Sequence, residues 1–225
     1  MKKYAVIVAA GAGLRMGGSL PKQFMLLAGK PVLWHTLRVF LDAYSDLEII
    51  LVVPEKYLEM AEKIVHSSAF PGRIRLVTGG ETRFDSVRRG LSLVLDPSVV
   101  FVHDGVRCLV TMDLIYRCYD MAIASGNAIP VMKSTDSIRI ELHGINTMVD
   151  RNCVRIVQTP QTFLSHSLLA AFDQQPEGAF TDEAAVVEKH GIEIHLVEGE
   201  ETNIKITRPI DLLVAGRILE ERGTR

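Results

Sequence analysis

The sequence predicts an α/β fold, in which a Rossmann-like, mainly parallel sheet is flanked by helices. Short runs rich in Val and Ile alternate along the chain with longer segments of helical periodicity, and this alternation is typical of a wound parallel sheet. The short runs are apolar on both faces, as strands buried beneath helices should be. A chain of 225 residues suits one large core, and we expect a single domain over 1–225.

The expected elements follow these two periodicities. Strands are predicted at Tyr4–Ala9, Glu48–Val53, Ile74–Val77, Val99–His103 and Ala128–Met132, with short late strands near Ile194–Val197 and Asn203–Ile206. Helices are predicted at Val32–Leu41, Glu55–His66, Asp85–Leu95, Thr111–Ser125, Ser165–Asp173, Asp182–His190 and Pro209–Glu221. Asp85 and Thr111 are the predicted N-cap residues of two of them. Because ligands bind outside the carboxyl ends of the strands in such sheets, the residues after each strand are the candidates for a site.

One segment, from Ser134 to Val157, breaks the alternation. Polar and apolar residues alternate there, with His143-Gly144 near the middle. The pattern predicts a protruding β-hairpin arm at about 134–157 with its turn near Gly144. A two-stranded arm is only marginally stable alone, so we expect it to pack on a second subunit.

The composition argues against several classes of protein. The net charge is −2, so no basic excess points to nucleic acid or to an acidic membrane. No apolar stretch is long enough to span a bilayer or to form a signal peptide. Cys108, Cys118 and Cys153 are odd in number and lack CxxC spacing, which argues against a disulfide framework or structural zinc. We expect a soluble, cytoplasmic protein with neither a nucleic-acid nor a membrane partner.

The loop after the first strand, Ala9–Phe24, reads AAGAGLRMGGSLPKQF. Its glycines, Gly11 and Gly13 among them, let the backbone approach a ligand closely, and exposed N–H groups in such a loop can bind phosphate. Arg15 and Lys22 add two cations. The loop is neither a dinucleotide-binding fingerprint nor a Walker A motif, but glycines and cations together after a first strand indicate a nucleotide site.

Asp104 stands at the carboxyl end of the strand predicted at Val99–His103. A lone carboxylate there can hold Mg²⁺, which keeps waters and takes other ligands from substrate phosphates. A turn or capping aspartate is the alternative interpretation. Neighbouring His103 is expected to be a packed residue rather than a ligand.

The loop AAGAGLRM…PKQF resembles the signature loop of nucleotidyltransferases with a GT-A-like fold. Its PKQ form is similar to the 2-C-methyl-D-erythritol 4-phosphate cytidylyltransferases of isoprenoid biosynthesis. Further matches follow in that family's order: GGETRFDSV (79–87), VHDGVR (102–107), VDRN (149–152), QTPQTF (158–163), TDEA (181–184) and NIKITRPID (203–211).

The resemblance implies transfer of CMP from CTP to methylerythritol phosphate, with Mg²⁺ as cofactor, in a homodimer whose arms cross between protomers. The catalytic residues it implies are Arg15, Lys22, Arg151 and Lys205, with Asp104 as metal ligand. It implies CTP contacts from Ala9, Ala10, Gly11, Gly13, Gly80, Glu81 and Ser86, and acceptor contacts from Arg107, Ser137, Arg151, Thr159 and Thr181. Both reactants are anionic, so fixed positive charge at the site suits this chemistry.

Several residues have other interpretations. HDGVRC replaces the family's usual HDAARP, and Ser137 stands where Thr is common. Arg83 is expected to be a structural ion-pair partner. Asp182 and Glu183 are adjacent on a helix and cannot face one point, so we expect them to cap and pack. A ribitol-5-phosphate cytidylyltransferase and a non-catalytic nucleotide-binding regulator remain the alternative functions.

Overall fold

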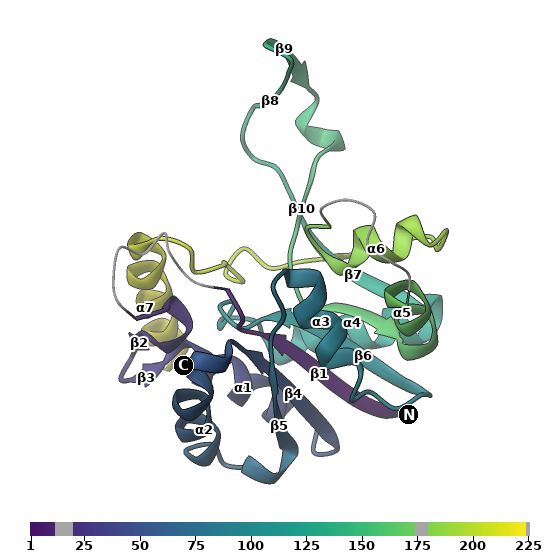
Figure 1. Ribbon diagram of the computed structural model, residues 1–225. Coiled ribbons are helices and arrows are strands. Elements are labelled where there is room, and N and C mark those ends of the chain that lie inside the picture. Colours follow the sequence, from purple (N-terminus) through teal and green to yellow (C-terminus); the bar gives the residue numbers. More distant parts are fainter. Residues whose placement is uncertain (12–19, 174–179, 224–225) are drawn as a thin grey trace.

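The wound sheet that the sequence predicts is present in the computed structural model, which describes residues 1–11, 20–173 and 180–223 (Figure 1). The main sheet has the strand order β10-β7-β11-β6-β1-β4-β5, and β12 pairs with β7. The strands are β1 Lys2–Val8, β4 Leu47–Val53, β5 Ile74–Thr78, β6 Ser98–Asp104, β7 Asn127–Lys133, β10 Arg155–Val157, β11 Gln161–Leu164 and β12 Leu196–Glu198. The five predicted strands of the first 133 residues are therefore confirmed, with ends that differ by one or two residues.

The sheet is mainly parallel. Strand β1 pairs in parallel with both β4 and β6, β4 with β5, and β12 with β7. Strand β11 runs antiparallel between β6 and β7, and β10 runs antiparallel to β7. The carboxyl ends of β1 and β6 therefore meet at one edge of the sheet, which is where a ligand site is expected.

Helices cover both faces of the sheet. Successive side chains of each strand point to opposite faces, and because the strands are apolar throughout, both faces are buried beneath helices. Ala5 and Ile7 of β1 pack with α1 (Val32–Ala43), α2 (Leu58–His66) and α4 (Met112–Ser125). Tyr4 and Val6 pack on the other face with α3 (Arg83–Leu91), α5 (Ser165–Phe172) and α6 (Glu183–Lys189). Helix α7 (Pro209–Gly223) joins a smaller cluster with Val106 and Ile206. Among the described residues, no helix combines the length and the apolar character needed to cross a membrane.

Three local predictions are wrong. The helix predicted from Asp85 starts at Arg83, and Thr82 is its N-cap, while Asp85 completes a capping box from the third helical position. The predicted helix from Glu55 opens as a 3₁₀ turn, Glu55–Tyr57, before α2 begins. Asn203–Ile206 forms no strand and pairs with none of the described strands; the backbone N–H of Ile206 donates instead to Val106 O at 3.0 Å. Thr111 is the N-cap of α4, as predicted.

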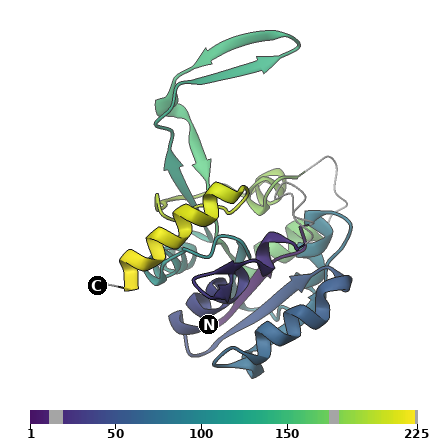
Figure 2. The same ribbon diagram turned by 90° about the vertical axis from the view of Figure 1, so that its left-hand side faces the viewer.

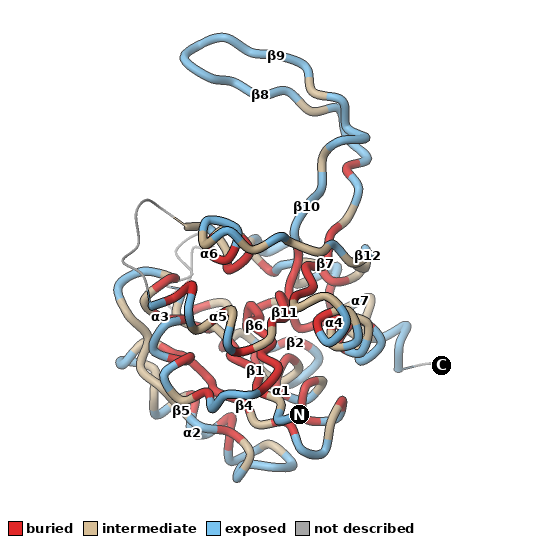
Figure 3. Tube along the Cα trace, turned by 90° about the vertical axis from the view of Figure 1, so that its right-hand side faces the viewer, coloured by how far each residue is buried: buried red, intermediate tan, exposed pale blue. Residues whose placement is uncertain are grey.

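The arm is confirmed as a hairpin. Its strands are β8 (Ile138–Leu142) and β9 (Ile145–Val149), and they pair only with each other among the described strands. The turn residues His143 and Gly144 both have positive φ, 52° and 80°, as a two-residue hairpin turn requires. The arm projects well away from the body (Figures 1 and 2), and nearly all of it is exposed (Figure 3).

Candidate functional site

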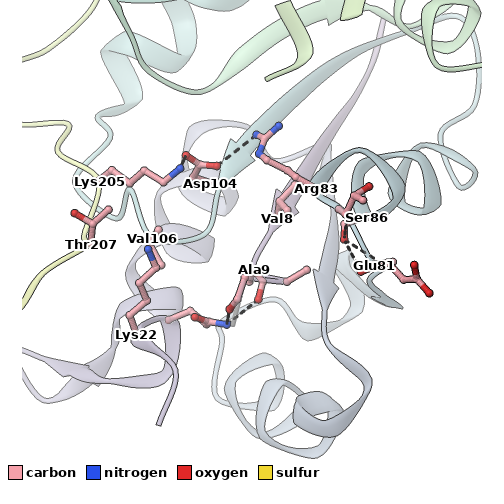
Figure 4. Close-up of a pocket in the computed structure, with 15 residues that line it drawn as sticks. Val8, Ala9, Lys22, Glu81, Arg83, Ser86, Asp104, Val106, Lys205 and Thr207 are labelled. Atoms are coloured by element: carbon pink, nitrogen blue, oxygen red, sulfur yellow. Dashed lines mark hydrogen bonds and ion pairs between the residues drawn. The ribbon is translucent and has the colours of Figure 1, made fainter. Parts of the chain in front are cut away.

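A cavity of about 560 Å³ opens at the carboxyl ends of β1 and β6. Many of the residues predicted to carry function line it: Ala9, Ala10, Gly11, Lys22, Gly80, Glu81, Ser86, Asp104 and Lys205. They come from segments far apart in the sequence, and the sheet edge brings them together (Figure 4). Arg15 and Gly13 lie outside the described residues.

Two loops form one wall of the cavity, one at the end of β1 and one before α3, and the glycines of the second loop leave no room for a side chain. A Cβ on Gly80 would lie 2.3 Å from the Cβ of Asp85, and a Cβ on Gly79 would lie 2.8 Å from that of Ala10. Ser86 is buried, and its hydroxyl accepts from the backbone N–H of Gly80 at 3.1 Å and donates to Thr82 O at 2.9 Å. The hydroxyl of Ser86 thus fixes the loop that lines the cavity.

Gln23 is a residue whose role the sequence did not reveal. Its side chain is buried, and its amide donates to Ala9 O at 2.8 Å and to Gly11 O at 3.2 Å. These bonds tie the short 3₁₀ turn Lys22–Phe24 to the end of β1. Gln23 therefore fixes the position of Lys22 relative to the start of the glycine-containing loop, and the Gln of the PKQ motif has a structural role.

Asp104 lies at the centre of the charged part of the site. Its carboxylate contacts Lys205 Nζ at 2.9 Å, Arg83 Nη2 at 3.4 Å and Arg107 Nε at 3.5 Å. Burial alone would raise the pKa of Asp104, but the three cations outweigh burial and hold that pKa well below its ordinary range. The carboxylate is therefore ionised at neutral pH.

Arg83 joins two carboxylates (Figure 4 shows its contact with Asp104). Its guanidinium forms a very short contact with Glu183 Oε1 and a second bond of 3.1 Å to Glu183 Oε2. The prediction that Arg83 is an ion-pair partner is confirmed. Asp182 caps α6 by accepting from Ala185 N at 3.0 Å, as predicted, but Glu183 is a buried ion-pair partner rather than a capping residue. Burial raises the pKa of Glu183, and the contacts with Arg83 oppose that rise.

His103 and Thr159 form the layer behind Asp104. His103 is fully buried, as expected for a packed residue, and burial lowers its pKa to about 4. The Thr159 hydroxyl hydrogen-bonds the His103 ring at 2.9 Å and accepts from the backbone N–H of Asp104 at 3.1 Å. Thr159, predicted to touch the acceptor, here fixes the backbone of Asp104.

Arg107, another predicted acceptor contact, joins three segments. Besides Asp104, it donates to Asn203 O at 2.9 Å and to Val157 O at 3.3 Å. The first of these bonds holds the segment that carries Lys205, and the second holds the base of the arm. Lys205 itself is exposed rather than in a buried strand, and its anionic partner within the chain is Asp104.

The remaining predicted residues lie away from this cavity's lining. Ser137 and Arg151 are on the arm, where Arg151 donates to Thr135 O at 2.9 Å. Thr181 is exposed just before α6. The structure thus groups the nucleotide residues in one cavity but does not bring the arm residues to it within one chain.

The donor set fits a hard divalent cation held partly by substrate. Among the described residues, no group of three or more His, Cys, Asp or Glu side chains could enclose a metal. Asp104 presents an ionised carboxylate at the cavity, and Glu81 also lines it. Mg²⁺ is commonly bound by one or two carboxylates together with phosphate oxygens and water, so these residues fit Mg²⁺ delivered with a nucleotide.

A wound sheet with close-packed loops and cations around a carboxylate at its carboxyl edge is the arrangement expected of a nucleotidyltransferase, and the family match shows this class. The chain belongs to the 2-C-methyl-D-erythritol 4-phosphate cytidylyltransferase family, whose model matches residues 4–221.

Relatives in sequence and in structure agree with this assignment. The enzyme of that name from Bacteroides thetaiotaomicron is 43% identical over 219 residues, which cover 97% of this chain and 100% of the relative. The one from Porphyromonas gingivalis is 45% identical over 219 residues, covering 97% and 98%. The crystal structure of 4-diphosphocytidyl-2C-methyl-D-erythritol synthase from Anaerococcus prevotii has a TM-score of 0.84 at 29% identity and covers 97% of this chain and 98% of that one.

Proposed function

We propose that this chain transfers CMP from CTP to 2-C-methyl-D-erythritol 4-phosphate, giving 4-CDP-2-C-methyl-D-erythritol and pyrophosphate in the non-mevalonate isoprenoid pathway. The observation that carries the proposal is the cavity in which Lys22 and Lys205 accompany Asp104 at the carboxyl edge of the sheet. The name shared by relatives more than 40% identical over nearly the full chain supports the choice of both substrates.

The chemistry needs positioning and positive charge rather than a protein nucleophile. An oxygen of the acceptor phosphate attacks the α-phosphorus of CTP, a new P–O bond forms, and the bond to the β-phosphate oxygen breaks to release pyrophosphate. Lys22 and Lys205 supply fixed cations to the phosphate groups as negative charge redistributes. Arg15 is proposed for the same role, on the family resemblance.

Binding of the nucleotide uses the two loops of the cavity wall. Ala10, Gly11 and Gly80 line the cavity with little or no side chain, so the base and ribose can approach the backbone there. Glu81 lies exposed at the same wall. Asp104 is proposed to hold Mg²⁺ together with the triphosphate, and the ion would neutralise phosphate charge during transfer.

The acceptor half of the site is proposed to be completed by a second subunit. Arg151 and Ser137 are carried on an arm that projects away from the body of its own chain (Figure 1). In a two-fold homodimer each arm can reach the partner's cavity, where Arg151 would bind the acceptor phosphate through paired hydrogen bonds. The proposal includes a cytoplasmic location, which the three free cysteines support.

The direct test is pyrophosphate release by the purified protein with CTP, Mg²⁺ and methylerythritol phosphate. We expect turnover that is abolished by EDTA and restored by added Mg²⁺. UTP, ATP and ribitol 5-phosphate, each substituted in turn, should support much less turnover. No release with the full mixture would refute the proposal, and preference for ribitol 5-phosphate would transfer the assignment to that acceptor.

A further inference from the structure

Glu183 is a buried carboxylate that the proposed reaction does not use. It is 1% exposed and is the first residue of α6. The start of this helix is fixed independently, because Gln161 Oε1 accepts from Ala184 N at 2.8 Å and Asp182 caps the helix. Glu183 is therefore held in place by the fold, and a charge buried in this way needs a partner.

The partner is Arg83, which faces two carboxylates unequally. Both carboxylate oxygens of Glu183 contact the guanidinium, and Arg83 Nη2 lies 3.1 Å from Glu183 Oε2 but 3.4 Å from Asp104 Oδ1. A paired contact of this kind fixes the plane of the guanidinium. Glu183 thus binds Arg83 closely and leaves it at a longer distance from Asp104.

The Arg83–Glu183 ion pair reduces the positive charge around Asp104. Lys205 and Arg107 also contact the carboxylate, so three cations share one acidic group at the cavity. A divalent cation approaching Asp104 meets their repulsion. Glu183 offsets the charge of one of the three and holds its guanidinium toward α6.

We propose that Glu183 is a positioning residue that, through Arg83, keeps the Asp104 carboxylate available to a divalent cation. The proposal rests on the proposed use of a divalent cation at Asp104. Without the Glu183 charge, Arg83 turns fully onto Asp104 and competes with the metal. Even at the dielectric constant of bulk water, about 80, a unit charge about 6 Å from a bound divalent ion changes the affinity for that ion by about tenfold.

The test is Mn²⁺ binding with CTP present and no acceptor, measured by the enhancement of the water-proton relaxation rate, which distinguishes Mn²⁺ bound to the protein from Mn²⁺ bound to CTP alone. We expect Glu183→Gln to weaken Mn²⁺ binding by about tenfold relative to the unmodified chain. Asp182→Asn is the matched control: it removes the same charge from the preceding residue, and Asn remains a good N-cap. Its Mn²⁺ affinity should stay within about twofold of that of the unmodified chain.

The double variant Arg83→Gln/Glu183→Gln separates positioning from a general structural role. With Arg83 also removed, nothing competes for Asp104 from that side, so we expect Mn²⁺ affinity to return to within about threefold of that of the unmodified chain. If Glu183→Gln does not fold, the Mn²⁺ affinity of the double variant tests the proposal instead. The double variant should fold because its two amide side chains can hydrogen-bond to each other and leave no buried charge unpaired. A folded double variant that binds Mn²⁺ about tenfold more weakly overturns the proposal.

Two other results are decisive. Unchanged Mn²⁺ affinity in folded Glu183→Gln overturns the positioning role but leaves the proposed function intact. Absence of Mn²⁺ binding by the unmodified chain with CTP overturns the metal part of the proposed function and this inference with it. A parallel pyrophosphate assay shows whether transferase activity survives in either case.

Discussion

The charged residues beneath the cavity and those on the arm are held in opposite ways. Asp104, Arg83 and Glu183 are largely buried and satisfy one another across three elements of one chain. Arg151, on the arm, is exposed and bonds a carbonyl of its own segment. The first group is organised before any ligand arrives, whereas the second needs contacts that its own body does not supply.

The apolar residues differ in the same way. Phe84 of α3 is 7% exposed and stacks on Phe172 with ring centroids 4.7 Å apart. On the arm, Leu142, Ile145 and Met148 are each at least 66% exposed. An exposed apolar hairpin is typical of a surface that is covered in an assembly. The body is stabilised by the chain itself, and the proposed homodimer would supply the cover for the arm.

The largest expected effect concerns Lys22, in the body. Lys22→Ala should lower kcat by about 1000-fold, since removing one preorganised charge from a transfer site costs about that much. Pyrophosphate release measures the loss, and the melting temperature should not change. Lys30→Ala is the control, because Lys30 is an exposed cation that contacts the Trp34 ring. Near-normal turnover in Lys22→Ala would exclude Lys22 from the chemistry.

The next effect tests the stability of the two regions. Phe84→Ala should lower the free energy of unfolding by about 3 kcal/mol, because it removes a stacked ring from the core. Ile145→Ala, measured by urea denaturation at concentrations low enough to dissociate a dimer, should change it by less than about 0.5 kcal/mol. A loss of similar size in both would mean that the arm packs on its own body.

Arg151 tests the function of the arm. Arg151→Ala should raise the KM for methylerythritol phosphate by about 30-fold. This factor corresponds to the loss of about 2 kcal/mol, which is typical of a hydrogen bond to a charged group. The KM for CTP should change by less than about twofold, since Arg151 does not line the nucleotide cavity.

Co-expression of Arg151→Ala with Lys22→Ala makes the test independent of KM. Random pairing makes half of the dimers mixed. If each arm serves the partner's site, every mixed dimer has one intact site out of two, so activity should recover to about a quarter of that of the unmodified protein. No recovery, with mixed dimers demonstrated, would place Arg151 in the site of its own chain.

The smallest effect concerns Asp211 at the start of α7. Burial alone would raise its pKa, but bonds of 2.7 Å from the N–H groups of Thr207 and Arg208 outweigh burial and lower it below 3.8. A lowered folded-state pKa contributes stability above the unfolded value, which is lost as pH falls through the folded value. Asp211→Asn keeps an accepting oxygen but removes the negative charge beside the helix N-terminus, so it should cost about 0.5 kcal/mol at pH 7. In thermal denaturation the difference should shrink as pH falls below the ordinary pKa of an aspartate and through the lowered pKa of Asp211.

Most of the fold could be predicted because buried parallel strands and amphipathic helices leave distinct periodicities. Strand β11 could not, because it is only four residues long and begins with two polar residues, Gln161 and Thr162, although both are buried. The Gln161 side chain satisfies its polarity by bonding Asp182 and Ala184. Asn203–Ile206 was misassigned for the opposite reason: its alternating pattern suits a strand, but no strand lies alongside it in the described structure.

The sequence by itself determined the wound sheet, the arm and the set of polar residues that follow the strands, since these depend on local pattern and on a recognisable series of motifs. The tertiary structure decided how those residues are partnered. Arg83 and Glu183 are 100 positions apart, and nothing in either segment indicates the other. They pair beside Asp104 because α3, α6 and β6 meet there. Only the packing of helices on the sheet fixes this meeting point. The same packing shows that Ser137 and Arg151, the arm residues proposed to bind the acceptor, lie apart from the cavity of their own chain.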